Sequence, residues 1–352
     1  MADYLVNAYP GLSGKLRKVT LANLPTPTGI DTIPTAPGGR EISIKHDNLT
    51  SSYYGGNKLR KLEYLLQRAI DKRAKRVATF GSVSSNHALA TALYAQRLEL
   101  GCTCLLSDQV KSPAVVRVLG MLMQCGAEIV HFGGSYRSRV ATMRQYVQGR
   151  RSFVIPLGGS SWLGAVGYVA AGLELASQVK AGHTEAPARI YIAAGTMGSA
   201  GGLALGLALA GLESEVQAVR VTPESIMNRE RLNRLMANTA AMLNRLDSSI
   251  PDDIHRRARI EVRHEFFGDG YAISNPDTDA AVTMARDALG LSLEPTYTGK
   301  AMAALLHDAA QPPHRDASLM FWNTYNSSPL PKMPGSTIDF GRLPAEFLHY
   351  FD

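Results

Sequence analysis

Residues 190–202 read Ile190-Tyr191-Ile192-Ala193-Ala194-Gly195-Thr196-Met197-Gly198-Ser199-Ala200-Gly201-Gly202. The apolar run that begins this stretch predicts a buried strand, and the glycines and hydroxyls after it predict a tight turn into a helix. The same strand-to-helix pattern recurs through most of the chain. Because strands that alternate with helices form parallel βαβ units, the sequence predicts an α/β fold with an open sheet covered by helices on both faces.

Apolar runs and helical spacing locate the other elements. Strands are expected at residues 41–46, 76–80, 101–107, 129–132, 153–156, 189–193, 216–221 and 318–322. Helices are expected at residues 58–72, 86–98, 114–125, 139–149, 164–180, 277–289 and 300–310, with another after Gly201 and a charged helical region after residue 221. The first 40 residues are expected to be extended, since Pro25, Pro27, Pro34 and Pro37 prevent a long helix. The last 25 residues, also broken by prolines, are expected to wrap the surface.

The composition is that of a folded protein. The chain has 352 residues, of which 45% are hydrophobic and 19% charged, so one large or two medium domains are expected. Its three cysteines do not make a disulfide framework. Cys102 and Cys104 would share one face of a strand, and Cys125 stands alone. Without a histidine cluster nearby, we interpret them as small buried hydrophobes and not as a metal site.

The formal net charge of +7 raises the question of a nucleic-acid partner. The densest basic region, residues 220–263, holds nine arginines but also six acidic residues. Such a mixture indicates solvated helix faces, so no nucleic-acid partner is expected. No N-terminal segment joins a basic start to an apolar core, and no apolar run approaches the ~20 residues that span a bilayer. We therefore expect a cytoplasmic protein with no membrane partner.

The turn at residues 195–202 is the clearest anion-binding candidate. Backbone N–H groups and hydroxyls at the positive end of a helix stabilise a phosphate. The glycines stand at positions 195, 198 and 201, not in Gly-x-Gly-x-x-Gly order, and the sequence lacks the Gly-Lys-Ser/Thr of a Walker loop. Met197 also occupies the first glycine position of a nucleophile elbow around Ser199. Taken alone, the turn predicts phosphate binding and tight helix-on-strand packing equally.

Three other segments carry nucleophilic or polar side chains. Lys58 follows two glycines at the start of a helical pattern, so its amine could act as a nucleophile. Residues 81–87 form a second strand-to-helix turn, where Ser85 or Asn86 would be an ordinary N-cap or the amides of residues 85–87 would bind a carboxylate. In the third segment, residues 294–300, Thr298 could cap a helix and Tyr297 could be a buried ring, and neither role excludes contact with an aromatic cofactor.

Together these motifs resemble the D-cysteine desulfhydrase and 1-aminocyclopropane-1-carboxylate deaminase family, which belongs to the tryptophan synthase β type of pyridoxal-phosphate enzymes. The resemblance runs in order from about residue 40 to residue 325, through residues 45–50, 55–63, 85–87, 156–160, 163–164, 167–168, 195–202, 270–271 and 297–302. It implies fold type II, with two open twisted, mostly parallel sheets and helices on both faces. It also implies pyridoxal 5'-phosphate in a cleft between a large domain (1–52 and 162–352) and a small domain (53–161), a small amino-acid substrate and a homodimer.

The resemblance implies a role for individual residues. Lys58 would form the Schiff base with the cofactor and, once displaced by the substrate amine, would transfer protons, which needs a neutral amine. Asn86 would bond the cofactor's phenolic oxygen, and Tyr297 would lie against its ring. The residues expected at the site are, for catalysis, Lys58, Ser85, Tyr271 and Tyr297; for the cofactor, Lys58, Asn86, Thr196, Met197, Gly198, Ser199, Ala200, Tyr297 and Thr298; and for the substrate, Ser85, Asn86, His87, Trp162 and Thr324. No metal ligand is expected.

Thr298 matches the partner of the cofactor's ring nitrogen. At this point the resemblance is to a Tyr-Glu-Gly pattern for the deaminase and to a Tyr-Thr-Gly pattern for the desulfhydrase. A carboxylate would keep the ring nitrogen protonated and enlarge the electron sink, as opening a cyclopropane ring demands. A neutral threonine suits removal of the α proton with loss of a good β leaving group, such as thiol, chloride or sulfite.

The sequence departs from the family pattern at four places. Ser84 stands where a glutamine usually precedes the Ser-Asn pair, and Ser199-Ala200 replaces Thr-His or Thr-Gln in the phosphate loop. Trp162 stands where a smaller residue is usual, and residues 323–326 read Asn-Thr-Tyr-Asn in place of His-Thr-Gly-Gly. These changes leave the cofactor chemistry in place and put the substrate in doubt.

The leading hypothesis is therefore a pyridoxal-phosphate lyase or deaminase, similar to D-cysteine desulfhydrase, that acts by β-elimination to give a 2-oxo acid and ammonia. Alternatives within the class are the cyclopropane deaminase, a sulfo-lyase acting on cysteate and a β-replacement enzyme. A different class is a catalytically altered binding protein on the same fold, which retention of Lys58 disfavours.

Overall fold

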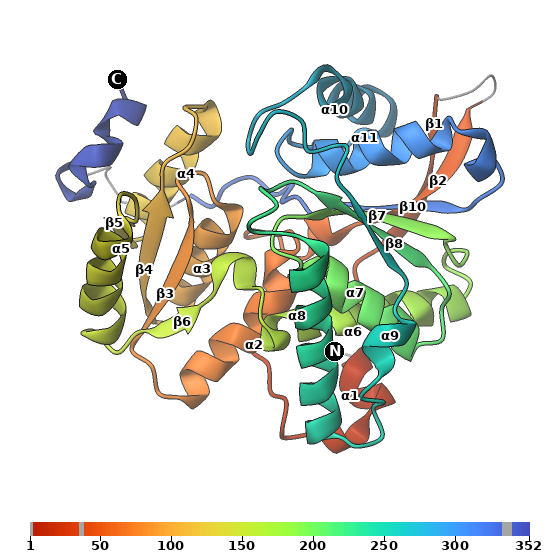
Figure 1. Cartoon of the computed structure of the whole chain (residues 1–352), viewed down its shortest axis with the longest axis horizontal. Helices are drawn as coiled ribbons and strands as arrows, with labels where there is room; N and C mark the ends of the chain where they lie inside the picture. Colours follow the sequence, from red (N-terminus) through yellow and green to blue (C-terminus); the bar gives the residue numbers. More distant parts are fainter. Residues whose placement is uncertain (1–2, 35–38, 333–339) are drawn as a thin grey trace. The chain divides into compact units, whose positions relative to one another are not determined.

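The computed structural model describes residues 3–34, 39–332 and 340–352 (Figure 1). The chain forms two compact units, which we call unit 1 (Met1–Arg17, Ala22–Lys61 and Ser160–Pro329) and unit 2 (Lys18–Leu21, Leu62–Gly159 and Leu330–Asp352). The domain limits expected from the sequence remain a proposal. Among the described residues, no helix combines the length and the apolar character needed to cross a membrane.

Unit 1 contains a six-stranded sheet in the order β1-β2-β10-β7-β8-β9. Its strands are β1 (Thr28–Ile33), β2 (Arg40–Lys45), β7 (Arg189–Ala194), β8 (Glu215–Arg220), β9 (Ile260–Arg263) and β10 (Leu319–Trp322). Only β1 is antiparallel to its neighbour; the other adjacent strands are parallel. The helices are α1 (Tyr4–Ala8), the start of α2 (Lys58–Asp71), α6 (Trp162–Lys180), α7 (Gly198–Leu209), α8 (Arg229–Leu246), α9 (Ile254–Arg257), α10 (Pro276–Leu289) and α11 (Thr298–Ala309).

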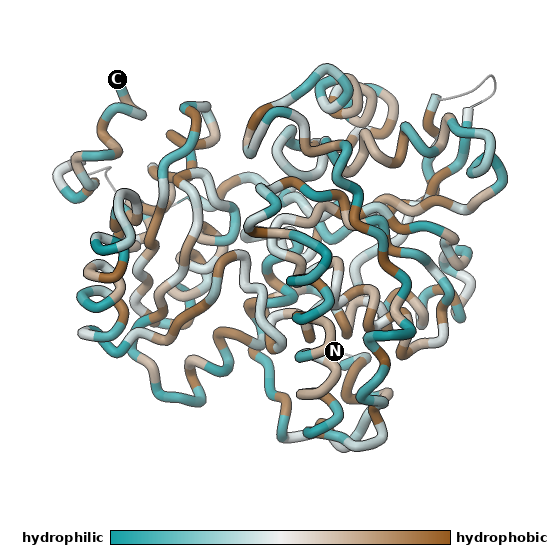
Figure 2. The backbone as a smooth tube through the Cα atoms, in the orientation of Figure 1, coloured by the Kyte–Doolittle hydropathy of each residue, from teal (hydrophilic) through white to brown (hydrophobic). Residues whose placement is uncertain are grey.

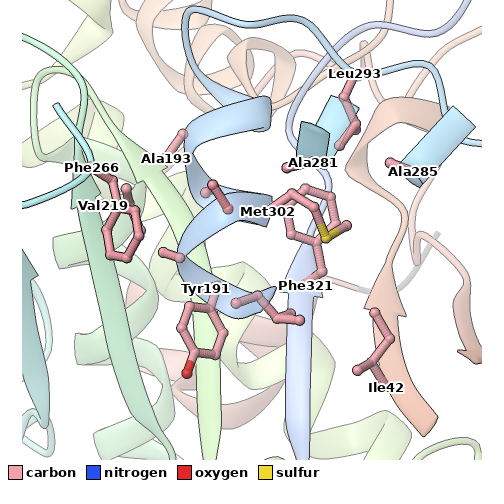
Figure 3. Close-up of a cluster of buried hydrophobic side chains, with 14 of the residues drawn as sticks. Ile42, Tyr191, Ala193, Val219, Phe266, Ala281, Ala285, Leu293, Met302 and Phe321 are labelled. Atoms are coloured by element: carbon pink, nitrogen blue, oxygen red, sulfur yellow. The ribbon is translucent and has the colours of Figure 1, made fainter. Parts of the chain in front are cut away.

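Helices cover both faces of the sheet in unit 1. Figure 1 shows α10 and α11 over one face and α6 and α7 over the other. Under α11, a buried cluster that includes Ile42, Tyr191, Val219, Met302 and Phe321 joins the helices to the central strands (Figure 3). The central strand β7 is accordingly mostly apolar, whereas α8 is rich in hydrophilic residues (Figure 2).

Unit 2 contains a four-stranded, fully parallel sheet in the order β5-β4-β3-β6. Its elements are β3 (Arg76–Ser82), α3 (Asn86–Arg97), β4 (Gly101–Ser107), α4 (Pro113–Gln124), β5 (Glu128–His131), α5 (Tyr136–Met143), which continues as a π-helical turn at Arg144–Gln148, and β6 (Phe153–Ile155). Helices α3 and α5 lie on opposite faces of this sheet (Figure 1). The two mostly parallel sheets with helices on both faces confirm the fold class expected from the sequence.

The N-terminal segment, expected to be extended and without a long helix, contains two elements that the sequence did not predict. The short helix α1 and the strand β1 lie within it, and β1 pairs with β2 in register from Thr28–Lys45 to Ile33–Arg40. Of the six residues of β1 only Ile33 is buried, so this edge strand lacks an apolar pattern. The edge strand β9 was missed for the same reason, because only Val262 among its residues is buried. Pro37 lies outside the described residues.

The C-terminal residues were expected to wrap the surface. Residues 333–339 lie outside the described part of the chain, and the residues after them form two short 3₁₀ helices, Phe340–Arg342 and Ala345–Tyr350. Phe347 and Tyr350 are buried in unit 2. The three cysteines are buried free thiols, and the sulfurs of Cys102 and Cys104 lie 3.8 Å apart on β4, as their spacing predicts.

A group of buried charges joins β2, α2 and α6 in unit 1. Arg60 donates to Asp47 Oδ1 at 2.7 Å and to Glu174 Oε2 at 2.9 Å, and Lys45 donates to Glu174 Oε1 at 2.6 Å. Tyr168 completes the group with a hydrogen bond of 2.6 Å to Asp47 Oδ2. Burial alone would raise the pKa of the Glu174 carboxyl, but the cations of Arg60 and Lys45 lower it to about 2. Both carboxylates are therefore paired charges inside the protein.

Replacing Arg60 with methionine should lower the free energy of unfolding by about 3–5 kcal/mol, because Asp47 and Glu174 would lose their shared cation inside the protein. Chemical denaturation followed by circular dichroism measures the change. The control is Arg234→Ala, which removes an exposed ion pair with Glu230 on α8 and should cost less than about 1 kcal/mol. Equal losses in the two variants would contradict a special role for the buried group.

Candidate active site

Lys58 is the first residue of α2, and the turn before it is held by backbone contacts. The N–H of Asn57 donates to the carbonyl oxygen of Thr324 at 3.1 Å, just beyond the end of β10. Gly56 adopts a φ of +92°, and a Cβ there would lie 2.9 Å from the same carbonyl oxygen. Only glycine fits this position without strain, which is why the two-glycine turn can deliver the lysine.

The Lys58 amine is poised to lose its proton. Burial lowers its pKa to about 8, although the Glu294 carboxyl opposes this shift. Its Nζ lies 6.0 Å from the centre of the Tyr297 ring. A neutral amine is a nucleophile and a base, so the group expected from the sequence as the reactive lysine has a substantial reactive fraction near neutral pH.

Tyr271 and Tyr297 form a pair beside Lys58. Their hydroxyl oxygens lie 2.7 Å apart, and their rings meet edge to face with centres 6.1 Å apart. Burial, reinforced by Tyr271, raises the pKa of the Tyr297 hydroxyl well above its usual value, so Tyr297 stays neutral. A Cβ on Gly195 would lie 3.2 Å from the Tyr297 ring. The two tyrosines and the glycine-rich loop therefore meet at one place.

The loop at residues 195–202 is tied to its surroundings by hydroxyl groups. Ser160 Oγ lies 2.8 Å from Thr196 Oγ1 and accepts the N–H of Gly198 at 3.1 Å. Ser199 Oγ accepts from Asn57 Nδ2 at 3.0 Å, which links the loop to the turn before Lys58. Met197 has a φ of +68°, a conformation that non-glycine residues seldom adopt and that concentrates at functional sites. Helix α7 begins at Gly198, directly after this strained residue.

Lys61 was not expected at the site. It lies one helical turn after Lys58 on α2, is only 2% exposed, and its Nζ lies 3.0 Å from the point that a Cβ on Gly198 would occupy. Burial, assisted by repulsion from Lys58, holds its pKa well below the usual value. An anion at the start of α7 would relieve that cost and gain the helix dipole. The three-residue spacing from Lys58 was the signal in the sequence.

Glu294 was also missed. Its carboxylate accepts the N–H groups of Thr296 and Tyr297, each at 2.8 Å, and of Thr298 at 2.9 Å. The hydroxyl of Thr298 donates to Glu294 Oε1 at 3.3 Å and accepts the N–H of Glu294 at 3.1 Å. Burial raises the pKa of Glu294, against these N–H groups, which lower it. A carboxyl group therefore lies within hydrogen-bonding distance of the neutral hydroxyl of Thr298.

The expected carboxylate turn lies in unit 2. Ser85 is the N-cap of α3 and accepts the N–H of Ala88 at 3.2 Å. A Cβ on Gly81 would lie 2.4 Å from that of Ser85, so glycine is required there. Asn86 is half-buried at the first position of the helix, and His87 is 3% exposed. Capping and carboxylate binding are compatible, because the first helical N–H groups remain at the helix end.

Two expected substrate residues lie at the ends of elements in unit 1. Trp162 is half-buried at the first position of α6, two residues after Ser160. Thr324 is 8% exposed and contributes its carbonyl to the turn before Lys58. Within unit 1, the contacts described above connect Lys58, the loop at 196–200, Tyr271, Tyr297 and Thr324. The roles of all these residues remain proposals.

These residues form a donor set that fits pyridoxal 5'-phosphate. A helix N-terminus, hydroxyl groups and the buried Lys61 suit a phosphate, and a lysine of lowered pKa beside an aromatic ring suits an aldehyde on a ring. Comparison with known proteins agrees. Residues 19–321 match the family described as "Pyridoxal-phosphate dependent enzyme".

Curated relatives are similar over most of the chain. The D-cysteine desulfhydrase of Klebsiella pneumoniae subsp. pneumoniae is 34% identical over 301 residues, covering 82% of this chain and 88% of the relative. That of Serratia proteamaculans is 33% identical over 289 residues, covering 79% and 84%. A solved ACC deaminase homologue superposes with a TM-score of 0.75 at 26% identity, covering 99% of this chain and 100% of the homologue. A pyridoxal 5'-phosphate-dependent aspartate racemase, at 18% identity and a TM-score of 0.60, covers 97% of each chain and shares the fold.

Borohydride reduction in the presence of pyridoxal 5'-phosphate should attach the cofactor to Lys58, as peptide mass spectrometry would show. Only the neutral amine attacks the aldehyde, so the rate of labelling should rise with pH and reach half its maximum near pH 8. Lys58→Ala should abolish the label at this peptide. Lys72→Ala, which removes an exposed lysine just beyond α2, should leave it unchanged, and a label retained in Lys58→Ala would refute the assignment.

Proposed function

Because this chain belongs to the pyridoxal-phosphate dependent enzyme family, we propose that it is a lyase that acts on a small amino acid by removal of the α proton and β-elimination. The products would be a 2-oxo acid, ammonia and the leaving group. The observation that carries this proposal is the position of the Lys58 amine, whose pKa is about 8, beside the ring of the neutral Tyr297, which directly precedes Thr298 at the start of α11. Similarity to the D-cysteine desulfhydrases supports it.

Pyridoxal phosphate, when bound, withdraws electrons from the α carbon of an attached amino acid and so acidifies the α proton. Lys61, Ser160 and the N–H groups of residues 196–200 would hold its phosphate. In unit 2, Ser85, Asn86 and His87 would have the roles that the family resemblance implies: Asn86 would bond the phenolic oxygen of the cofactor, and the amides at the start of α3 would bind the substrate carboxylate.

Lys58 and Tyr297 would move the protons. The Lys58 amine would take the α proton of the substrate, because a pKa of about 8 leaves an appreciable neutral fraction near pH 7. The neutral hydroxyl of Tyr297, held by Tyr271 at 2.7 Å, can donate a proton to a departing group.

Thr298 supports elimination over ring opening. A neutral hydroxyl at the ring nitrogen gives a weaker electron sink than a carboxylate, and a good leaving group compensates for it. The cyclopropane deaminase is the second candidate. Its ring nitrogen partner is a carboxylate, and here the Glu294 carboxyl lies close to that position, with Oε1 3.3 Å from the Thr298 hydroxyl. The solved ACC deaminase homologue also points to this alternative.

We propose the class of the substrate, a small amino acid, and not its identity. Trp162 and residues 323–326 differ from the usual family pattern, so the substrate need not be cysteine. The expected homodimer rests on the family resemblance, and the expected cytoplasmic location rests on composition.

A panel of amino acids should identify the leaving group. D- and L-cysteine, β-chloroalanine, cysteate and 1-aminocyclopropane-1-carboxylate would each be assayed for release of a 2-oxo acid. At least one substrate with a β leaving group should react faster than the cyclopropane, and Lys58→Ala should be inactive with all of them. Cofactor binding without 2-oxo acid release from any of these compounds would favour a binding protein or a β-replacement enzyme.

Replacing Tyr297 with phenylalanine should lower kcat by roughly 10²- to 10⁴-fold, the usual contribution of a positioned acid or base, while the cofactor still binds. Tyr271→Phe keeps the Tyr297 hydroxyl and should cost less. Tyr136→Phe is the matched control, since this ring is 83% exposed on α5, and its kcat should equal that of the wild type. An unchanged kcat in Tyr297→Phe would exclude the hydroxyl from proton transfer.

A further inference from the structure

Ser84 is a departure from the family pattern whose consequence lies in unit 2. The position usually carries a glutamine before the Ser-Asn pair, and here it carries a short hydroxyl side chain. Ser84 Oγ donates to the side-chain oxygen of Gln109 at 2.7 Å. Gln109 lies two residues beyond the end of β4, so a glutamine side chain reaches the turn from the neighbouring strand.

We propose that Gln109 supplies the amide that position 84 has lost, and that it binds the carboxylate of the amino-acid substrate beside the start of α3. This inference rests on the proposed function and adds a specificity-determining residue to the same site. A carboxamide has one acceptor end and one donor end. Since Ser84 holds the oxygen, the two N–H donors of Nε2 are the end available to an anion.

The backbone of Gln109 is fixed from both sides by the C-terminal segment, residues 340–352. Its N–H donates to the hydroxyl of Tyr350 at 3.1 Å, and the same hydroxyl donates to its carbonyl oxygen at 2.8 Å. Tyr350 is 2% exposed. Figure 1 shows this segment beside α4 and β5 at the end of the unit 2 sheet where β4 finishes. Tyr350 is therefore a positioning residue for the Gln109 side chain.

Two further contacts hold the loop that carries Gln109. Lys111 Nζ donates to the carbonyl oxygens of His349 at 3.3 Å and Asp352 at 2.7 Å. The N–H of Val83 donates to the carbonyl oxygen of Ser107 at 3.0 Å, which joins the end of β4 to the turn at residues 81–87. A loop fixed in this way presents a side-chain amide at little entropic cost.

The charged side chains beside Gln109 in the loop have both signs. Asp108 Oδ2 lies 2.8 Å from His131 Nε2, and Lys111 Nζ donates to two carbonyl oxygens of the C-terminal segment. The Gln109 amide itself is neutral, and a neutral amide donor beside helix N–H groups attracts a carboxylate.

Gln109→Ala tests the inference in the holoenzyme. Loss of one hydrogen bond to a charged group should raise KM by roughly 10- to 100-fold, with kcat within about twofold of the wild type. Glycine, which has no leaving group, is the probe for binding without turnover, and its affinity, followed through the cofactor absorbance, should fall by the same factor. Gln148→Ala removes an exposed glutamine of unit 2 and should change neither value.

Two further variants separate ligand binding from folding. Ser84→Gln introduced into Gln109→Ala should restore most of the lost affinity, which a structural role of Gln109 would not predict. Tyr350→Phe should raise KM without lowering kcat, and circular dichroism would verify that it folds.

Unchanged KM and glycine affinity in Gln109→Ala would overturn the inference, and failure of Ser84→Gln to rescue would overturn the replacement of one amide by the other. If the wild type itself neither reacts with nor binds any amino acid, it is the proposed function that fails.

Discussion

The buried pairing of Arg60 with Asp47 and Glu174 is the interaction on which the site depends. These three groups come from α2, from the turn after β2 and from α6, and all are at most 1% exposed. Arg60 lies two residues after Lys58, so the pairing fixes the first turn of the helix that carries the amine. Gly167 of α6 lies so close to this turn that a Cβ would stand 1.9 Å from the Arg60 carbonyl oxygen. A charge removed from this group would free the first turn of α2 and leave another charge buried without its partner.

Once α2 is fixed, three helices of unit 1 begin at one place. Helices α2, α7 and α11 start at Lys58, Gly198 and Thr298, and they are linked by the Asn57–Ser199 hydrogen bond and by the Tyr297 ring. The partial positive charges of helix N-termini favour an anion and disfavour a protonated amine. Burial at this place lowers the pKa of the Lys58 amine to about 8, and repulsion from Lys58 adds to the burial that lowers the pKa of Lys61. One arrangement therefore buries the amine proposed to react and gathers the groups proposed to bind a phosphate.

Short-range patterns in the sequence predicted the features that depend on neighbouring residues. The alternation of strands and helices, the start of α2 at Lys58 and the glycine turn at residue 195 all follow from short-range spacing. The missed elements have other causes. Strands β1 and β9 lie at sheet edges with one buried residue each, so no apolar period marks them. Glu294 and the partners of Arg60 act through contacts that folding alone creates, as between Arg60 and Glu174, which are 114 residues apart. Ser84 was recognised as unusual, but the position of Gln109 beside it could be seen only in the folded chain.

The segment at residues 323–326, which departs from the usual family pattern, contacts the rest of unit 1 through both backbone and side-chain groups. Two of its contacts are made by the backbone: the Asn323 N–H donates to the carbonyl oxygen of Lys45 at the end of β2 at 2.9 Å, and the Thr324 carbonyl accepts the N–H of Asn57, in the turn before Lys58, at 3.1 Å. Backbone groups persist whatever side chains stand there. The side chain of Asn326 makes a further contact, because its Oδ1 accepts the N–H of Gly55 at 2.6 Å. A glycine, usual at this position in the family, would lack this hydrogen bond. Substitution of the side chains here can therefore leave the backbone bond that holds the turn before Lys58 in place.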